Sequence, residues 1–392
     1  MKRIFFIAAA ALLLTGCYYK TDTPRGSWAK GCDLSWLSEM EHDGVLFYGD
    51  GVPADAKPTK VKETKRKADV GENARPQGEQ DCIALLRGLG MNSVRLRVWV
   101  NHSTGWSNKD DMLALAKRAA KQGQRIMIDI HYSDFFADPS HQTIPEAWKD
   151  YDFATMRDAV REHTLDVLYA LKEEGIKPEW VQIGNETPNG MLWPMGRIDG
   201  EETTDEAWDR YAGLTRAGYD AAKEAFSDIN VIVHIDNAYM YRDWFWTNLA
   251  EHGGKWDMIG LSHYPMMFEW CQKPWQEMNQ LAETNVKRLI QEWHCPVMIC
   301  EVGMLNYGVG YEYDFTAMLS NIAMTDFVER MQRIDSCAGI FYWEPEVYGG
   351  WRPAEYIPLG WGSYNMGAFT PNGRPAPALR TLLYSKKANT LE

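Results

Sequence analysis

The chain lacks a glycine-rich phosphate loop, a domain linker and an excess of positive charge. Its 41 Lys and Arg stand against 54 Asp and Glu, a net charge of −13, which would repel a polyanion and argues against a nucleic-acid partner. No Gly/Ser-rich or Pro-rich linker occurs between residues 80 and 385. The length therefore favours one large domain over two.

The seven cysteines form no CxxC pair and have no zinc-ligand spacing, so no metal site is expected from them. Cys32 and Cys300 fall in apolar runs and are expected to be buried thiols. A bridge between Cys271 and Cys295 stays open, because export permits disulfides and spacing does not fix pairing.

The first residues, MKRIFFIAAAALLLTGC, combine two cations with an apolar run too short to span a bilayer. Leu14-Thr15-Gly16-Cys17 resembles the bacterial lipobox. We therefore expect residues 1–16 to be a signal peptide, a lipid on the thiol of Cys17, and residues 17–29 to be a tether. The prediction is an exported lipoprotein of the cell envelope, held to the membrane only by lipid, with the membrane face open. An ordinary secretory signal is the alternative. No later stretch is long and apolar enough to span a membrane.

Eight short apolar, β-branched runs alternate with helical patterns, such as residues 110–123, 205–226 and 315–333. Strand and helix repeated eight times predict parallel strands closed into a single (β/α)₈ barrel over residues 30–392. An open doubly wound sheet is the alternative, disfavoured by the missing phosphate loop. Residues 50–80 are a long polar insertion in the first βα loop, expected to be a solvated surface loop, with a role in substrate binding as the alternative. The predicted strands are 32–37, 93–100, 125–132, 180–186, 230–236, 258–264, 296–303 and 338–345.

Ionisable side chains gather where these strands end, the rim that carries the active site in such barrels. Glu186 follows the fourth strand and Glu301 lies on the seventh, so they should face one another across the barrel mouth. Paired carboxylates flanking a glycosidic bond are the means of sugar hydrolysis. We expect the cation of Arg97 to keep one of them ionised as the nucleophile, while the other stays protonated.

Seven short sequence motifs narrow the class of enzyme further. GCDLSWL (31–37), VRLRVWV (94–100), DIHYSDFFADP (129–139), QIGNE (182–186), GLSHYP (260–265), ICEVG (299–303) and FYWEP (341–345) resemble the endo-β-1,4-galactanases of glycoside hydrolase family 53. The resemblance spans roughly residues 30–370. It implies a retaining endo-hydrolase of β-1,4-galactan and type I arabinogalactan, working without a cofactor. The loop at 304–315 lacks the Asp-rich segment through which some family members bind calcium.

The resemblance also implies individual roles. Glu186 would be the general acid/base and Glu301 the nucleophile, with a carboxyl separation of about 5–5.5 Å. Asn185 would bind the 2-hydroxyl of the sugar at the scissile bond. The other implied substrate-binding residues are Arg97 and Tyr264, which would orient Glu301, His131 and His263, which would line the pocket, and Trp343, which would lie under the sugar.

The chain is rich in rings, with 17 Trp and 19 Tyr, and sugar faces are common partners for exposed rings. Trp99, Trp193, Trp351 and Trp361 are further stacking candidates, although a place in the core is as compatible with the sequence. Two alternatives remain: an endo-hydrolase of another β-1,4-linked polysaccharide, and a catalytically inactive sugar-binding lipoprotein. The sequence leaves chain-length preference and processivity open. A monomer is the default expectation.

Overall fold

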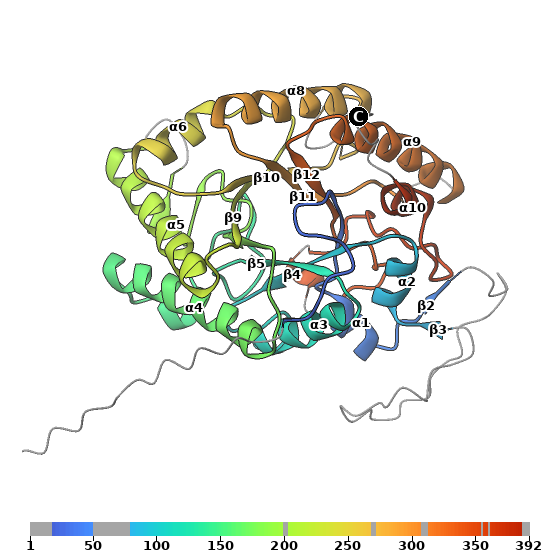
Figure 1. Ribbon diagram of the computed structural model, residues 1–392, viewed down its shortest axis with the longest axis horizontal. Helices are drawn as coiled ribbons and strands as arrows, with labels where there is room; N and C mark the ends of the chain where they lie inside the picture. Colours follow the sequence, from blue (N-terminus) through green and yellow to red (C-terminus); the bar gives the residue numbers. More distant parts are fainter. Residues whose placement is uncertain are drawn as a thin grey trace, which may run out of the picture.

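The computed structural model describes residues 18–49, 79–198, 203–267, 272–306, 313–353, 356–359 and 361–385. Eight parallel strands close into a barrel in the order β1-β12-β11-β10-β9-β6-β5-β4, which confirms the predicted (β/α)₈ fold (Figure 1). Six of them lie within predicted runs, whereas β1 and β12 overlap theirs and begin three residues and one residue before them. The strands are β1 Ala29–Asp33, β4 Ser93–Val98, β5 Arg125–Ile130, β6 Trp180–Ile183, β9 Asn230–Ile235, β10 Met258–His263, β11 Val297–Val302 and β12 Cys337–Tyr342.

Helices surround the barrel, and several begin at residues whose side chains cap the free backbone N–H groups (Figure 1). Asp152 accepts from the backbone N–H of Thr155, and Thr204 accepts from that of Ala207. The three helical patterns predicted from sequence correspond to α3, α5 and α9. The helices are α1 Leu37–His42, α2 Cys82–Gly88, α3 Lys109–Lys121, α4 Phe153–Glu173, α5 Asp205–Ala225, α6 Asp243–Glu251, α8 Trp275–Trp293, α9 Tyr313–Gln332 and α10 Pro377–Tyr384.

Shorter elements decorate the loops. β2 (Phe47–Tyr48) pairs antiparallel with β3 (Glu79–Gln80), and β7 (Gly190–Met191) pairs with β8 (Gly196–Arg197). The 3₁₀ turns η1 and η2 cover Glu146–Trp148 and Ile357–Leu359. Residues 50–78 of the predicted polar insertion lie outside the described residues.

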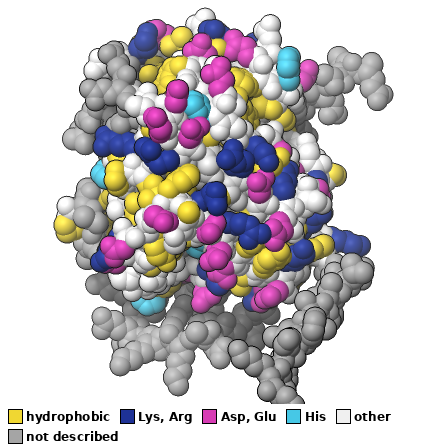
Figure 2. All heavy atoms as spheres, turned by 90° about the vertical axis from the view of Figure 1, so that its left-hand side faces the viewer, with side chains coloured by type: hydrophobic (Ala, Val, Ile, Leu, Met, Phe, Trp, Pro, Cys, Tyr) yellow, Lys and Arg dark blue, Asp and Glu magenta, His cyan; other side chains and the backbone are white. Residues whose placement is uncertain are grey.

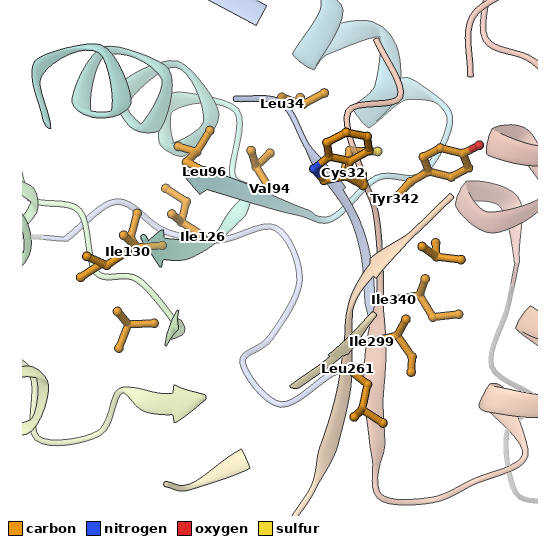
Figure 3. Packing of buried hydrophobic residues seen from close by; sticks show 14 of the residues in the cluster. Cys32, Leu34, Val94, Leu96, Ile126, Ile130, Leu261, Ile299, Ile340 and Tyr342 are labelled. Atoms are coloured by element: carbon orange, nitrogen blue, oxygen red, sulfur yellow. The ribbon is translucent and has the colours of Figure 1, made fainter. Parts of the chain in front are cut away.

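Two apolar layers hold the barrel together. Side chains alternate along each strand, so Val94 and Leu96 of β4 join the cluster packed beneath the helices, whereas Arg95 and Arg97 point to the barrel interior. Figure 3 shows part of this outer cluster, with side chains from neighbouring strands such as Ile126 beside them. The outer layer is mainly apolar, so most of the buried polar groups of the strands lie in the barrel interior.

Below the polar groups of its C-terminal end the interior carries an apolar layer, with Arg125 beyond that layer at the N-terminal floor. Met127, Trp180, Ile232 and Phe341 belong to the interior cluster. Gly31 makes room for it, because a Cβ there would lie 2.1 Å from the ring of Phe341. The apolar layer closes the barrel towards its N-terminal end, which leaves the opposite rim for a ligand.

Among the described residues, no helix is long and apolar enough to cross a membrane, and no cluster of His, Cys, Asp and Glu could hold a metal ion. Cys32 and Cys300 are buried free thiols, as expected. Cys295 is also free, and Cys271 lies outside the described residues. Figure 2 shows acidic and basic side chains interspersed on one face, with no broad area of a single sign.

Candidate active site

The polar rim is built by sharp turns of the backbone immediately after the strands. Glu186 (φ +44°), Asn237 (φ +52°) and Glu344 (φ +43°) all have left-handed backbone conformations at the C-terminal ends of β6, β9 and β12. Such conformations are unfavourable for residues other than glycine and concentrate at functional sites. Each of these residues turns the backbone sharply, so neighbouring side chains at the strand end point in different directions.

Arg95 lies at the centre of the site and contacts four of its side chains. Its guanidinium lies 2.8 Å from Glu301 Oε1 and 2.9 Å from Asp129 Oδ2, and it also contacts Asp33. It donates to the side-chain oxygen of Asn185 at 2.8 Å. All these groups are buried, so the cation offsets the cost of placing three carboxylates in one interior.

Glu301 is held at both oxygens. Arg95 contacts Oε1, and the hydroxyl of Tyr264 donates to Oε2 at 2.5 Å. The prediction that Tyr264 holds Glu301 is therefore confirmed. The prediction that Arg97 does so is wrong, because Arg97 lies nearer the wall of the cavity and contacts Glu344 Oε1 at 2.7 Å.

Arg97 instead supports the aromatic wall. Its guanidinium carbon lies 4.4 Å from the ring centre of Phe136 and 5.7 Å from that of Trp36. The ring of Phe136 stacks on Trp361 at 4.5 Å, and Trp36 contacts Trp343 at 5.7 Å. Arg97 thus lies behind two tryptophans that line the cavity.

Glu186 and Glu301 differ in their surroundings. Burial, and then the neighbouring Glu301 and Asp236, raise the pKa of Glu186 well above its ordinary value. Burial also raises the pKa of Glu301, but Arg95 and then Tyr264 oppose that rise. No cation lies among the groups that shift Glu186, whereas Glu301 has two donors that favour its carboxylate. Glu186 is therefore the one of the pair that holds a proton, and Glu301 is the one that ionises.

The side chain of Asn185 is fixed beside Glu186. Its amide nitrogen donates to the carbonyl of Ala137 at 2.8 Å, and its oxygen accepts from Arg95. The loop that presents Ala137 is itself held by His131, whose Nδ1 accepts from the Ala137 N–H at 3.0 Å. His131 Nε2 then donates to Asp129 at 2.8 Å. Burial lowers the pKa of His131, which agrees with a neutral ring that accepts at one nitrogen and donates at the other.

His263 is placed differently from its prediction. It is fully buried, its Nε2 lies 2.8 Å from Asn279 Oδ1, and its ring stacks on Phe327 at 4.2 Å. It is absent from the residues that line the cavity. Because it lies on the last residue of β10, one step before Tyr264, the alternation of the strand turns it towards the helices rather than the mouth.

A cleft opens over the carboxylates. Trp343 and Tyr364 stack at 6.2 Å on its wall, and Trp361 also lines it. Of the other candidate rings, Trp99 is fully buried, and Trp193 and Trp351 lie outside the lining. The predicted residues that line the cleft are Arg97, His131, Asn185, Glu186, Tyr264, Glu301 and Trp343.

Sequence reasoning assigned no role to several lining residues. Arg95 shares a face with Arg97, and alternation alone cannot tell which of two inward residues reaches the centre. Asp236 stands at the end of β9 and forms an ion pair with Arg242. The sequence shows Asp236 as a polar residue at a strand end. Its effect on the pKa of Glu186 depends on distances that the sequence does not give. Phe136 lies within the motif at 129–139 but was given no role of its own, and Tyr364 comes from a loop that carried no signal.

Comparison with known proteins agrees with this geometry. The family model described as Glycosyl hydrolase family 53 matches residues 29–382. An arabinogalactan endo-beta-1,4-galactanase of Thermothelomyces thermophilus is 31% identical over 278 residues, covering 67% of this chain and 80% of that protein. An uncharacterized protein of Niallia circulans is 32% identical over 315 residues, covering 74% and 82%.

Solved structures show the same architecture. A structure from a study of two fungal beta-1,4-galactanases superimposes with a TM-score of 0.72 at 25% identity, covering 91% of this chain and 98% of that one. The catalytic domain of a family 53 protein from Ignisphaera aggregans has a TM-score of 0.68 at 23% identity, covering 94% and 99%. The match of a family model over most of the length, joined to a barrel with two carboxyl groups in one cleft, decides the assignment: the chain belongs to glycosyl hydrolase family 53.

Proposed function

We propose that the protein is an endo-acting hydrolase of β-1,4-galactosidic bonds in galactan and type I arabinogalactan, working with retention of configuration. The observation that carries the proposal is the unequal pair Glu186 and Glu301 in one cleft. The galactanase relatives support the polymer, and membership of family 53 supports the reaction class.

In the first step, the ionised Glu301 attacks the anomeric carbon while Glu186 protonates the leaving glycosidic oxygen. A bond forms between Glu301 and the sugar, and the bond to the leaving sugar breaks. Arg95 and Tyr264 keep Glu301 in one orientation and lower the free energy of its carboxylate. Asn185, fixed through Arg95 and Ala137, binds the 2-hydroxyl of the sugar under attack.

In the second step, Glu186 is a carboxylate and takes a proton from water, which attacks the anomeric carbon and releases Glu301. Each carboxyl group returns to its starting state, so no cofactor is consumed. The rings of Trp343, Trp361 and Tyr364 supply flat apolar walls against which sugar faces stack. Their position along the open cleft suits a bond within a chain rather than at its end.

Another endo-hydrolase specificity would use the same carboxylates and differ only along the cleft. Product release from linear β-1,4-galactan, with mannan and a β-glucan in parallel, separates the two. We expect galacto-oligosaccharides of several lengths from galactan alone, and none from Glu301→Ala. Cleavage of mannan or glucan instead would change the assigned substrate and leave the proposed mechanism unchanged. Binding without cleavage by the wild type would favour an inactive sugar-binding protein.

We also propose that the mature chain is an exported, monomeric lipoprotein. Lipid on Cys17 would anchor it to the membrane, with no segment of the chain spanning the bilayer. The support is the sequence motif before Cys17, since residues 1–17 lie outside the described residues. Intact mass of the membrane-extracted protein tests this. A diacylglyceryl group on Cys17, absent in Cys17→Ser, is the expected result, and an unmodified mature chain would contradict it.

A further inference from the structure

The segment that follows Cys17 lies against one end of the barrel. The backbone N–H of Tyr19 donates to the carbonyl of Gly175 at 2.9 Å, and that of Asp22 donates to the carbonyl of Gly123 at 2.8 Å. Gly175 lies between α4 and β6, and Gly123 lies between α3 and β5. Both loops belong to the N-terminal face of the barrel, opposite the catalytic cleft.

Further contacts continue along the same face. Arg25 donates to the carbonyls of Pro178 and Asp228 at 3.3 Å, and the backbone N–H of Gly26 donates to Glu179 Oε1 at 2.8 Å. The three acceptors lie immediately before β6 and β9. In Figure 1 the blue segment before β1 crosses the centre of the ring of helices.

Both ends of this segment are held. Arg125, inside the barrel floor, donates to the carbonyls of Ser27 at 2.8 Å and Trp28 at 3.3 Å. At the other end, the ring of Tyr18 packs 6.3 Å from that of Phe226, and Lys177 lies 5.9 Å from the Tyr18 ring. Residues 18–28 of the predicted tether (17–29) therefore make contacts along their length, and Ala29 already begins β1.

Resting on the proposed lipid anchor, we infer that the barrel sits on the membrane in one orientation, with its N-terminal face towards the lipid and its cleft away from it. Consecutive Cα atoms are about 3.8 Å apart, so a lipid on Cys17 joins the protein next to Tyr18 on that face. A free tether of this length would span about 20 Å and allow every orientation. The contacts of residues 18–28 remove that freedom.

This orientation has a consequence for the substrate. α3 has 13 residues and runs between the two faces, so at about 1.5 Å per residue they are about 20 Å apart. The cleft is thereby held at least that far above the lipid headgroups and opens outward. A long polysaccharide can then enter the cleft without approaching the membrane.

Energy transfer to fluorescent lipids tests the orientation. A dye is attached at Ser103→Cys, exposed in the loop after β4, or at Lys121→Cys, exposed at the end of α3. Cys271 and Cys295 are replaced by serine, and the full lipidated protein is placed in phosphatidylcholine vesicles carrying acceptor lipid. Inserting 20 Gly/Ser residues between Cys17 and Tyr18 gives the matched control, a flexible chain of about 25 Å.

We expect strong transfer from the Lys121→Cys site, weak transfer from the Ser103→Cys site, and similar values once the linker is inserted. Equal transfer from both sites without the linker, or stronger transfer from Ser103→Cys, overturns the orientation while the anchor stands. If the protein with an intact Cys17 is found to carry no lipid and does not bind the vesicles, the anchor and the orientation are overturned together. Galactan hydrolysis in solution reports the proposed activity separately.

Discussion

Tyr264→Phe removes one of the two groups that hold Glu301 and leaves the ring in place. The hydroxyl donates to Glu301 Oε2 at 2.5 Å inside the cleft. A hydrogen bond to a charged group contributes about 1.5–3 kcal/mol. Each 1.36 kcal/mol is a factor of ten in rate, so kcat/KM should fall by about 10- to 150-fold.

The same change should alter the pH dependence. Burial raises the pKa of Glu301, and Arg95 and Tyr264 oppose it, so loss of the hydroxyl raises that pKa further. Because Glu301 must be ionised to attack, the acid limb of the profile of kcat/KM should move to higher pH. Tyr219→Phe is the matched control, since its hydroxyl donates to Asp257 at 3.0 Å outside the cleft. An unchanged acid limb together with kcat/KM within twofold of wild type would refute the role of Tyr264.

Three further predictions test other parts of the account. Glu186→Ala should lose hydrolysis of galactan by at least 100-fold, yet release a burst of dinitrophenol from a dinitrophenyl galactoside, because that leaving group needs no proton; the absence of a burst would argue against Glu186 as the acid. Arg97→Met should lower the free energy of unfolding by about 3–5 kcal/mol in denaturant titrations at pH 8, because the carboxylate of Glu344 is left buried without its cation. Burial, and then Asp33, raise the pKa of Glu344 to about 7, so that pH keeps the wild-type pair ionised. Asp166→Asn breaks the exposed ion pair with Lys109 and should lower the free energy of unfolding by less than about 1 kcal/mol. Equal losses of stability in the two variants would contradict the contrast between a buried and an exposed ion pair. Proton NMR of the first products should show the β anomer before mutarotation, and an initial α anomer would contradict retention.

The barrel could be predicted from the sequence because its signals are local. Each strand is a short apolar run, each is separated by a helical pattern, and eight repeats leave few closed arrangements. The start of β1 was displaced because Ala29 and Lys30 carry little apolar signal. Strand ends also gave Glu186 and Glu301 as candidates, since ionisable groups are costly to bury without use or pairing.

The pairing of charges inside the barrel could not be predicted in the same way. Arg95 and Arg97 are both inward, and two residues along a strand differ by only about 6.6 Å in height. Which of them reaches Glu301 depends on strand tilt and on the competing carboxylate of Glu344, which follows β12 near the end of the chain. The prediction for His263 was wrong for a related reason, because a histidine at a strand end can face the helices as readily as the mouth of the barrel.

The central claim is that Glu301 attacks the sugar while Glu186 supplies the proton. A 2-deoxy-2-fluoro galactobioside with a good leaving group slows both steps and allows the covalent intermediate to accumulate. Peptide mass spectrometry after such treatment should find one sugar adduct, on the peptide and residue of Glu301, and none in Glu301→Ala. An adduct on Glu186, or inactivation without any adduct, would contradict the account.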